Sequence, residues 1–257
     1  MEDALGVLLL NRNHKGVDLT PAGRTFLHHA STVLQQMERM RGDMGQYSSG
    51  IKGHVRLLGN TSACSEYLPA LLGSFLAHQP DISIDLEERS STDITDLIRQ
   101  GMADIGMVAD SADLHDLETF PVRPDPLVVI TAEHYPESIP DRPCLADVSH
   151  LDFAGLVAGS ALQDHIATQG RQAGRHLQYR VRVRSLDAVC RMAGNGVGIA
   201  IVPLTAAERY QRELRLRLLP LSDSWARRHL VLCIRDADAL PTYVRALMQH
   251  ILTQEQQ

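Results

Sequence analysis

The sequence predicts an α/β protein of two lobes that follows a small hairpin and a long helix. Beyond residue 50, short apolar runs alternate with segments of helical periodicity, which is typical of a mostly parallel sheet covered by helices. This alternation occurs twice, once over 54–109 and again over 127–203. The length of 257 residues suits one large or two small domains with a sizeable core.

Composition and charge exclude several classes of protein. With 44% hydrophobic and 22% charged residues, the chain has ordinary globular usage and is not a disordered or fibrous protein. Residues 1–50 carry equal numbers of acidic and basic side chains, so the net charge of −6 lies in 51–257. A basic surface that coats nucleic acid is therefore not expected in the larger part of the chain.

The sequence also predicts the cellular compartment. No apolar run is as long as the roughly 18 residues of a membrane span, and no signal peptide opens the chain. Cys64, Cys144, Cys190 and Cys233 form no CxxC pair, so neither a zinc site nor a disulfide framework is indicated. We expect a cytoplasmic protein with reduced thiols and no membrane contact.

The first residues predict a hairpin that leads into a helix. Residues 2–5 resemble the last turn of a helix that ends at Gly6, so we expect a further segment before them. The extended runs 8–13 and 17–20 flank a glycine-containing turn and predict a β-hairpin. A Thr-Pro pair at 20–21 then supplies an N-cap hydroxyl and a proline suited to the first helical position.

The helix that begins at Pro21 carries a narrow apolar seam. Its members recur at steps of three and four, which is typical of a helix that pairs with another helix. We expect the seam to form a dimer with a second copy of the chain; packing against the chain's own domain is the alternative. Gly42, Gly45 and the stretch 48–50 predict a hinge. The seam residues are Phe26, Ala30, Val33, Met37, Met40 and Met44.

Residues 5–23 resemble the end of the recognition helix, the wing and the start of the linker helix of LysR-type transcriptional regulators. Leu10 and Lys15 stand where phenylalanine and arginine are usual. The family's first helices and most of its recognition helix have no counterpart here, so we expect an N-terminally truncated winged helix-turn-helix. The matched positions are Leu5, Gly6, Leu9, Arg12, Val17, Leu19, Thr20, Ala22 and Gly23.

The resemblance gives the hairpin a DNA-binding role. It implies that Arg12, His14 and Lys15 contact DNA phosphates, which positions a protein on DNA without reading its sequence. A hairpin tip that is simply solvated is the alternative for these side chains.

Residues 51–257 divide into strands and helices in a regular order. Strands are predicted at 54–59, 82–88, 104–109, 127–132, 152–158, 179–185, 197–203 and 229–235. Helices are predicted at 66–79, 93–100, 161–173, 186–194 and 240–254. The last strand and helix are expected to return to the first lobe, which makes that lobe discontinuous.

This stretch resembles the effector-binding domain of the same family, a bilobed fold like that of periplasmic binding proteins. The resemblance lies in Leu68-Pro69, in Pro80, and in the segments 101–108 and 194–203. It divides the chain into a winged-helix remnant, a linker helix with hinge, and an effector domain of two lobes. The boundaries are 1–20, 21–50 and 51–257, with lobe I at 54–119 plus 222–257 and lobe II at 120–221.

A ligand site is predicted between the lobes. In open α/β sheets ligands bind at the carboxyl ends of strands, and two facing lobes place such ends across one cleft. Thr61, Ser62, Ser91 and Ser160 follow such strands and open helices, where hydroxyls and backbone N–H groups favour a small anion. The family's effector contacts fall at the same junctions. These residues as simple helix N-caps are the alternative, and one hydroxyl can serve both purposes.

No catalytic set, metal site or cofactor motif is indicated. The 12 histidines show no HxxxH or HExxH spacing on one helix and are expected at the surface. No Gly-x-Ser-x-Gly elbow, phosphate loop or dinucleotide fingerprint is found. Arg180, Arg182 and Arg184 alternate along a strand and predict one sheet face that is solvated or faces another subunit, in preference to an anion site.

The sequence thus favours a ligand-responsive transcriptional regulator of the LysR type that acts as a homodimer or homotetramer. In this interpretation a small anionic effector enters the cleft, alters the dimer or tetramer geometry and repositions the wings on DNA. The alternative is a stand-alone effector-binding and dimerisation module without specific DNA binding. An enzyme is not expected, since no nucleophile, base or metal spacing is present.

Overall fold

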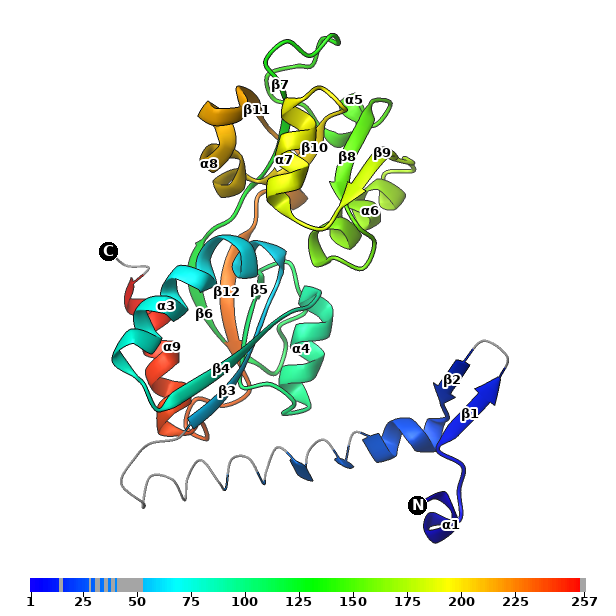
Figure 1. Ribbon diagram of the computed structural model, residues 1–257, viewed down its shortest axis with the longest axis vertical. Helices are drawn as coiled ribbons and strands as arrows, with labels where there is room; N and C mark the ends of the chain where they lie inside the picture. Colours follow the sequence, from blue (N-terminus) through cyan, green and yellow to red (C-terminus); the bar gives the residue numbers. More distant parts are fainter. Residues whose placement is uncertain are drawn as a thin grey trace.

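The structure of the protein is a computed structural model in which two lobes lie one above the other (Figure 1). Two separate segments of chain connect the lobes, and a helix with a hairpin precedes them. The structure describes residues 1–13, 16–27, 29–30, 33–34, 37, 40 and 53–254.

The N-terminal elements agree with the predicted helix stub and hairpin. The stub α1 spans Glu2–Leu5 and ends at Gly6, whose φ of 68° is left-handed. The strands β1 (Leu10–Asn13) and β2 (Gly16–Leu19) pair in antiparallel fashion. The Glu2 carboxylate accepts hydrogen bonds from the N–H groups of Leu9, at 2.6 Å, and Leu10, at 3.0 Å, and so joins the stub to the hairpin.

The helix after the hairpin begins where Thr20 and Pro21 predict. Residues 21–27 are helical, and the Thr20 hydroxyl accepts the N–H of Gly23 at 2.9 Å. The same hydroxyl donates to the carbonyl of Leu8 at 2.7 Å. Glycine is needed at 23 because a Cβ there would lie 2.0 Å from the carbonyl oxygen of Leu9. The first turn of the helix is therefore held against the hairpin.

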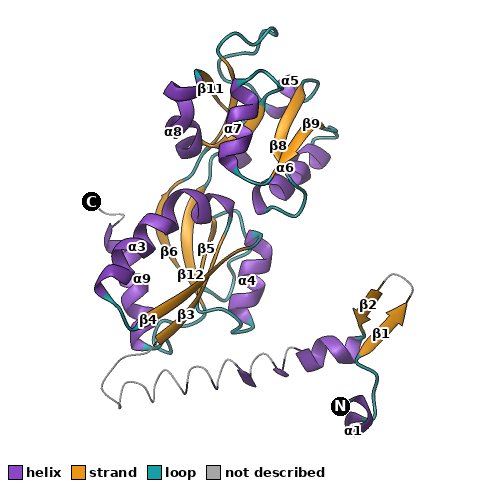
Figure 2. Ribbon diagram, in the orientation of Figure 1, coloured by secondary structure: helices purple, strands orange, loops and turns teal. Residues whose placement is uncertain are grey.

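Lobe I is a five-stranded sheet in the order β4-β3-β5-β12-β6. Helices α3 and α9 cover one face of this sheet and α4 covers the other (Figure 2). The strands are β3 (Gly53–Gly59), β4 (Ile82–Glu88), β5 (Ile105–Ala109), β6 (Glu118–Pro124) and β12 (His229–Ile234). The helices are η1 (Ala63–Tyr67, a π-helix), α3 (Leu68–His78), α4 (Ser91–Arg99) and α9 (Thr242–Gln254).

Lobe II has its own core and two smaller sheets, β10-β7-β11 and β8-β9, linked by a bridge between Phe153 and Ile199. The strands are β7 (Leu127–Ala132), β8 (Asp152–Leu156), β9 (Gln178–Val183), β10 (Ala200–Pro203) and β11 (Leu216–Pro220). The helices are α5 (Leu145–Val148), α6 (Ala161–Gln172), α7 (Leu186–Gly194), α8 (Leu204–Leu214) and η2 (Ser224–Ala226).

Two details of the predicted fold are wrong. The sheets are not mostly parallel, because β12 runs antiparallel to β5 and β6, and β7 runs antiparallel to β10 and β11. The lobe boundaries also differ: β6 extends lobe I to Pro124, and Ala226 still packs in the core of lobe II. The sequence hides β6 because it contains Pro121 and Pro124, which an edge strand tolerates.

The exposed arginine face is where the sequence predicts it. Arg180 and Arg182 in the edge strand β9, and Arg184 directly after it, are exposed, while Val181 and Val183 are half-buried between them. No helix in the described part of the chain is long and apolar enough to cross a membrane.

Candidate ligand site between the two lobes

A cavity of about 350 Å³ lies where the lobes face each other, within the usual size of small-molecule sites. Both lobes contribute to it, and its lining is dominated by small and polar side chains. We call this cavity the cleft. Its lining residues are Asn60, Thr61, Ser62, Ser90, Ser91, Thr92, Asp93, Ala109, Ser111, Ala112, Gly159, Ala161, Leu162, Asp164, His165, Thr168 and Arg228.

The predicted site residues come together around the cleft. Thr61, Ser62 and Ser91 line it directly. Ser160 does not line it, although its neighbours Gly159 and Ala161 do. Three of the four predicted positions, which follow two different strands, therefore line one cavity, and the fourth is next to two residues that do.

Only one of the four predicted hydroxyl residues acts as a helix N-cap through its side chain. Ser160 caps α6, since its hydroxyl accepts the N–H of Gln163 at 3.4 Å. The cap of α4 is Ser90, whereas the hydroxyl of Ser91 accepts the N–H of Ala109 at 3.3 Å. The other two positions, Thr61 and Ser62, have contacts of a different kind.

Thr61 connects the two lobes across the cleft. Its hydroxyl oxygen accepts the N–H of Leu162, in the first turn of α6, at 3.0 Å. Its proton is donated to the Glu88 carboxylate at 2.6 Å. The orientation of one lobe is thereby coupled to a side chain that a ligand in the cleft would meet.

Ser62 contacts a buried ion pair at the point where the chain crosses between lobes. Its hydroxyl accepts from Arg228 Nη2 at 2.6 Å, and the same nitrogen lies 2.6 Å from the Asp125 carboxylate. The two crossing segments are also joined through their backbones, since Asp125 N–H donates to the Arg228 carbonyl at 2.9 Å. Arg228 Nε in turn donates to the Asp125 carbonyl at 3.0 Å. Asp125 and Arg228 thus join the two chain segments that cross between the lobes. We call them the hinge pair; they are distinct from the hinge predicted at 42–50.

Burial controls the charge of two groups near the cleft. Desolvation raises the pKa of Asp125 above its usual range, an effect that the Arg228 guanidinium partly offsets. Burial, together with the charge of Arg228, lowers the pKa of His165 to about 4. His165 is therefore a neutral imidazole at physiological pH.

The sequence did not identify Asn60, Asp125, His165 or Arg228. His165 is half-buried and lines the cleft, so the expectation that all histidines are surface residues is wrong for it. Asn60 carried a signal, because an asparagine between a strand and a helix is a typical N-cap. Asp125 and Arg228 carried none, since only the fold places them together.

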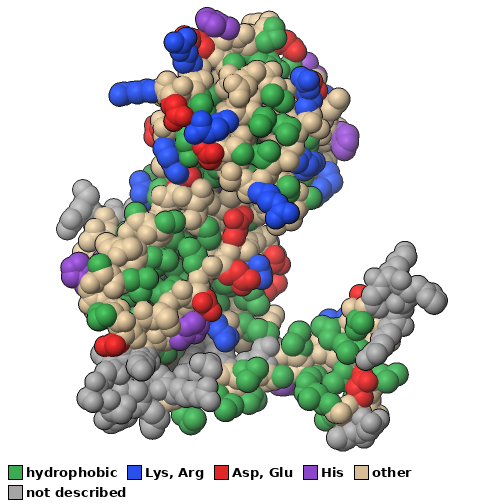
Figure 3. Space-filling view, viewed as in Figure 1, with side chains coloured by type: hydrophobic (Ala, Val, Ile, Leu, Met, Phe, Trp, Pro, Cys, Tyr) green, Lys and Arg blue, Asp and Glu red, His purple; other side chains and the backbone are tan. Residues whose placement is uncertain are grey.

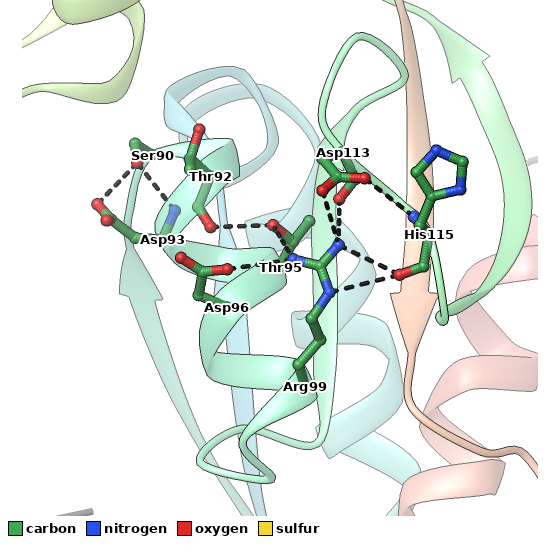
Figure 4. A network of polar contacts seen from close by, with 8 residues as sticks. All are labelled: Ser90, Thr92, Asp93, Thr95, Asp96, Arg99, Asp113 and His115. Carbon is green, nitrogen blue, oxygen red and sulfur yellow. Dashed lines mark hydrogen bonds and ion pairs between the residues drawn. The ribbon is translucent and has the colours of Figure 1, made fainter. Parts of the chain in front are cut away.

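Helix α4, which forms one wall of the cleft, is fixed at both ends (Figure 4). At its start the Ser90 hydroxyl accepts the N–H of Asp93 at 3.1 Å and donates to the Asp93 carboxylate at 2.7 Å. At its end Arg99 donates to the carbonyl of Asp113, at 2.8 Å, and lies 3.1 Å from the Asp96 carboxylate. Side-chain contacts therefore hold this helix at both its start and its end.

A second group of contacts joins the lobes through η1. The hydroxyls of Tyr67 and Thr205 lie 2.5 Å apart, and Glu66 forms an ion pair with Arg209 of α8. Together with Thr61, these residues give one short helical segment three contacts to lobe II.

The predicted DNA-contact and seam residues are only partly described. Arg12 lies in β1 opposite Val17, but its side chain, and the whole of His14, Lys15 and Met44, lie outside the described residues. Phe26 and Ala30 are half-buried, whereas large seam members farther along the helix are exposed. Those exposed members are Val33, Met37 and Met40.

The chemistry of the cleft is that of a binding site. Among the described residues, no group of three or more His, Cys, Asp or Glu side chains is placed to hold a metal ion. Hydroxyl and amide groups, one paired guanidinium and a neutral imidazole can bind and orient a small polar molecule.

These features define a two-lobed α/β binding domain with a polar interlobe cleft. The chain belongs to the LysR family of transcriptional regulators, since the family model described as the LysR substrate binding domain matches residues 48–256. A probable hydrogen peroxide-inducible genes activator of Mycobacterium leprae is 22% identical over 252 residues, 98% of this chain and 81% of that protein.

Two solved structures have the same fold. CbnR, a LysR family transcriptional regulator, covers 100% of this chain and 86% of its own, with a TM-score of 0.64 and 18% identity. The regulatory domain of CcmR from Synechocystis PCC6803, in complex with 2-PG, covers 79% of this chain and 97% of its own. Its TM-score is 0.65 at 19% identity.

Proposed function

We propose that this protein is a ligand-responsive regulator whose small-molecule effector binds in the cleft between the lobes. The observation that carries the proposal is a single cavity lined by polar groups of both lobes and of the hinge residue Arg228. A ligand that touches both lobes binds with different affinity at different lobe angles, and so shifts their equilibrium. Thr61 and η1 are the elements through which such a shift would pass.

The lining indicates a small, polar and anionic effector. No Phe, Tyr or Trp side chain is found among the described residues that line the cleft. The first turns of α4 and α6 face the cleft, and helix N-termini favour negative charge, although these two turns also contain the carboxylates of Asp93 and Asp164. The 2-PG complex of the structurally similar CcmR domain supports a small ligand of this kind.

The response would reach DNA through the linker helix. Val33, Met37 and Met40 are exposed on it, which supports pairing with a second copy in a dimer or tetramer. A change in lobe angle would then alter the geometry of the paired helices and of the hairpins that carry Arg12, His14 and Lys15. In this mechanism the basic side chains bind phosphates.

A thiol-based response to peroxide is not favoured, although one relative is named for such a role. The reactive form of cysteine is the thiolate. Burial raises the pKa of the Cys64, Cys190 and Cys233 thiols to about 12, so these three stay protonated. The polar cleft is therefore a better candidate for the sensing site than any of these three cysteines.

Thermal-shift screening of the full chain with small anionic metabolites, followed by calorimetry, tests the proposal. Ser62→Ala should weaken the best ligand by about fivefold or more, because it removes a hydroxyl from the cleft. Ser74→Ala is the matched control: Ser74 lies on α3 outside the cleft and should leave affinity unchanged. Equal affinity in both variants would place the ligand elsewhere.

A further inference from the structure

Asn60, which lines the cleft, has a buried hydrogen-bond donor. Its side chain caps the helical segment that begins at Thr61, since Oδ1 accepts the N–H of Ala63 at 2.9 Å. This cap fixes the orientation of the amide, so the remaining atom is the donor nitrogen Nδ2. Asn60 is 4% exposed and lines the cleft, yet Nδ2 has no hydrogen-bond partner among the described residues. Such buried donors are rare in native proteins and call for a partner.

His165 supplies a second group of the same kind from the opposite lobe. Its Nε2 is buried without a hydrogen-bond partner among the described residues, and the side chain lines the cleft. The ring packs against the edge of Trp225, with 5.6 Å between ring centroids, which helps to hold it in place. A neutral imidazole nitrogen can donate to an oxygen or accept from a hydroxyl.

The charges around these two groups do not favour a second anionic site. Arg228 lies within 2.6 Å of the Asp125 carboxylate and also donates to Ser62, so its charge is already paired. Asp93 and Asp164 line the same cleft. A negatively charged group placed beside Asn60 and His165 would therefore meet no unpaired cation among the described lining residues.

We propose that Asn60 Nδ2 and His165 Nε2 together bind an uncharged oxygen of the effector, a carbonyl or a hydroxyl. The ligand class is then a small non-aromatic acid with one negative charge and one neutral oxygen, that is, an oxo or hydroxy acid. This inference rests on the proposed function, in which the cleft is the effector site.

The ligands for the test are matched acids that differ in one oxygen. Pyruvate, lactate and propionate, with their four- and five-carbon homologues, are titrated into the full chain, and malonate and succinate serve as dianions. An acid that lacks the oxygen leaves the buried donor unpaired, so the oxygenated acids should bind between about fivefold and a hundredfold more tightly.

Two substitutions of Asn60 distinguish the role of its donor nitrogen from the role of its oxygen as a helix cap. Asn60→Asp retains an oxygen that caps the helix and replaces the donor by a second oxygen, and Asn60→Ser retains only the cap. Both should lose the preference for the oxygenated acid, as should His165→Phe in part. Asn195→Asp adds the same charge at an exposed position of lobe II and should retain the preference.

The outcomes distinguish this inference from the proposed function. An unchanged preference in both Asn60 variants, or tighter binding of the dianions, overturns the inference. If only another class of molecule binds and Ser62→Ala weakens it, the inference is wrong and the proposed function stands. If no ligand responds to any substitution in the cleft, both are wrong.

Discussion

The N-terminal arm, that is, the described part of residues 1–40, differs from the two lobes in how far its apolar side chains are exposed. Among the described residues of the arm, Leu8 is 67%, Val33 59% and Leu34 61% exposed. In the lobes the described large apolar side chains are buried or nearly so, and the two most exposed, Leu76 and Val157, reach 36% and 38%. Figure 3 shows apolar side chains along the described part of the arm. The described apolar side chains of the arm are therefore more exposed than those of the lobes, as the proposed pairing with a second copy predicts.

The largest expected effect is on self-association of the chain through the seam of the linker helix. Val33→Glu combined with Met37→Glu places two charges on the exposed seam and should weaken self-association at least about a hundredfold, since each apolar side chain contributes about 1.5–3 kcal/mol when buried. Sedimentation velocity measures this. Thr25→Glu, on an exposed site of the same helix, is the control and should leave association intact. An unchanged oligomer in the double variant would mean that the seam is not the interface.

The next largest effect is expected from a substitution that breaks the Asp125–Arg228 pair between the lobes. Arg228→Met leaves the Asp125 carboxylate buried without its cation and should lower the free energy of unfolding by about 3–5 kcal/mol. Arg217→Met removes an exposed ion pair with Asp141 and should cost less than about 1 kcal/mol. Urea unfolding compares the two variants. Equal costs would contradict the structural role of the hinge pair.

A smaller effect depends on pH. The folded-state pKa of His165 is about 4 against an ordinary 6.5, so the unfolded chain binds the proton first as pH falls. Stability should therefore be lost between about pH 6.5 and pH 4, by about 2 kcal/mol from pH 7 to pH 5. His165→Gln should remove that part of the loss in urea unfolding at the two pH values. The same pH dependence in both proteins would show that His165 is not buried as described.

Local signals in the sequence were enough for most of the architecture. Thr20 and Pro21 marked the helix start, and apolar patterns placed the strands of the lobes except β6 and β11 and the α-helices except α5 and α8. Position alone brought Thr61, Ser62 and Ser91 to one cleft, because strand ends meet at the edges of sheets. Helix caps, apolar periodicity and strand ends can all be recognised from residues that are close together in the sequence.

What the sequence missed depends on residues far apart in the chain. Asp125 and Arg228 pair only after two separate crossings between lobes, and neither has a local pattern that reveals its partner. The environment of His165 likewise depends on Trp225 and Arg228. The donor of Asn60 became visible only when its cap to Ala63 fixed the amide. Side-chain environments of this kind follow from packing and not from periodicity.

The most direct test of the cleft as the effector site is hydrogen exchange of the full chain with and without its tightest-binding acid. Another cavity of about 350 Å³, between α3 and α9 and lined by Phe75, His78 and His250, provides the internal comparison. We predict slower amide exchange at 59–63, 90–93 and 159–165 and no change at 74–79 and 246–254. Protection confined to the α3–α9 cavity would contradict the account.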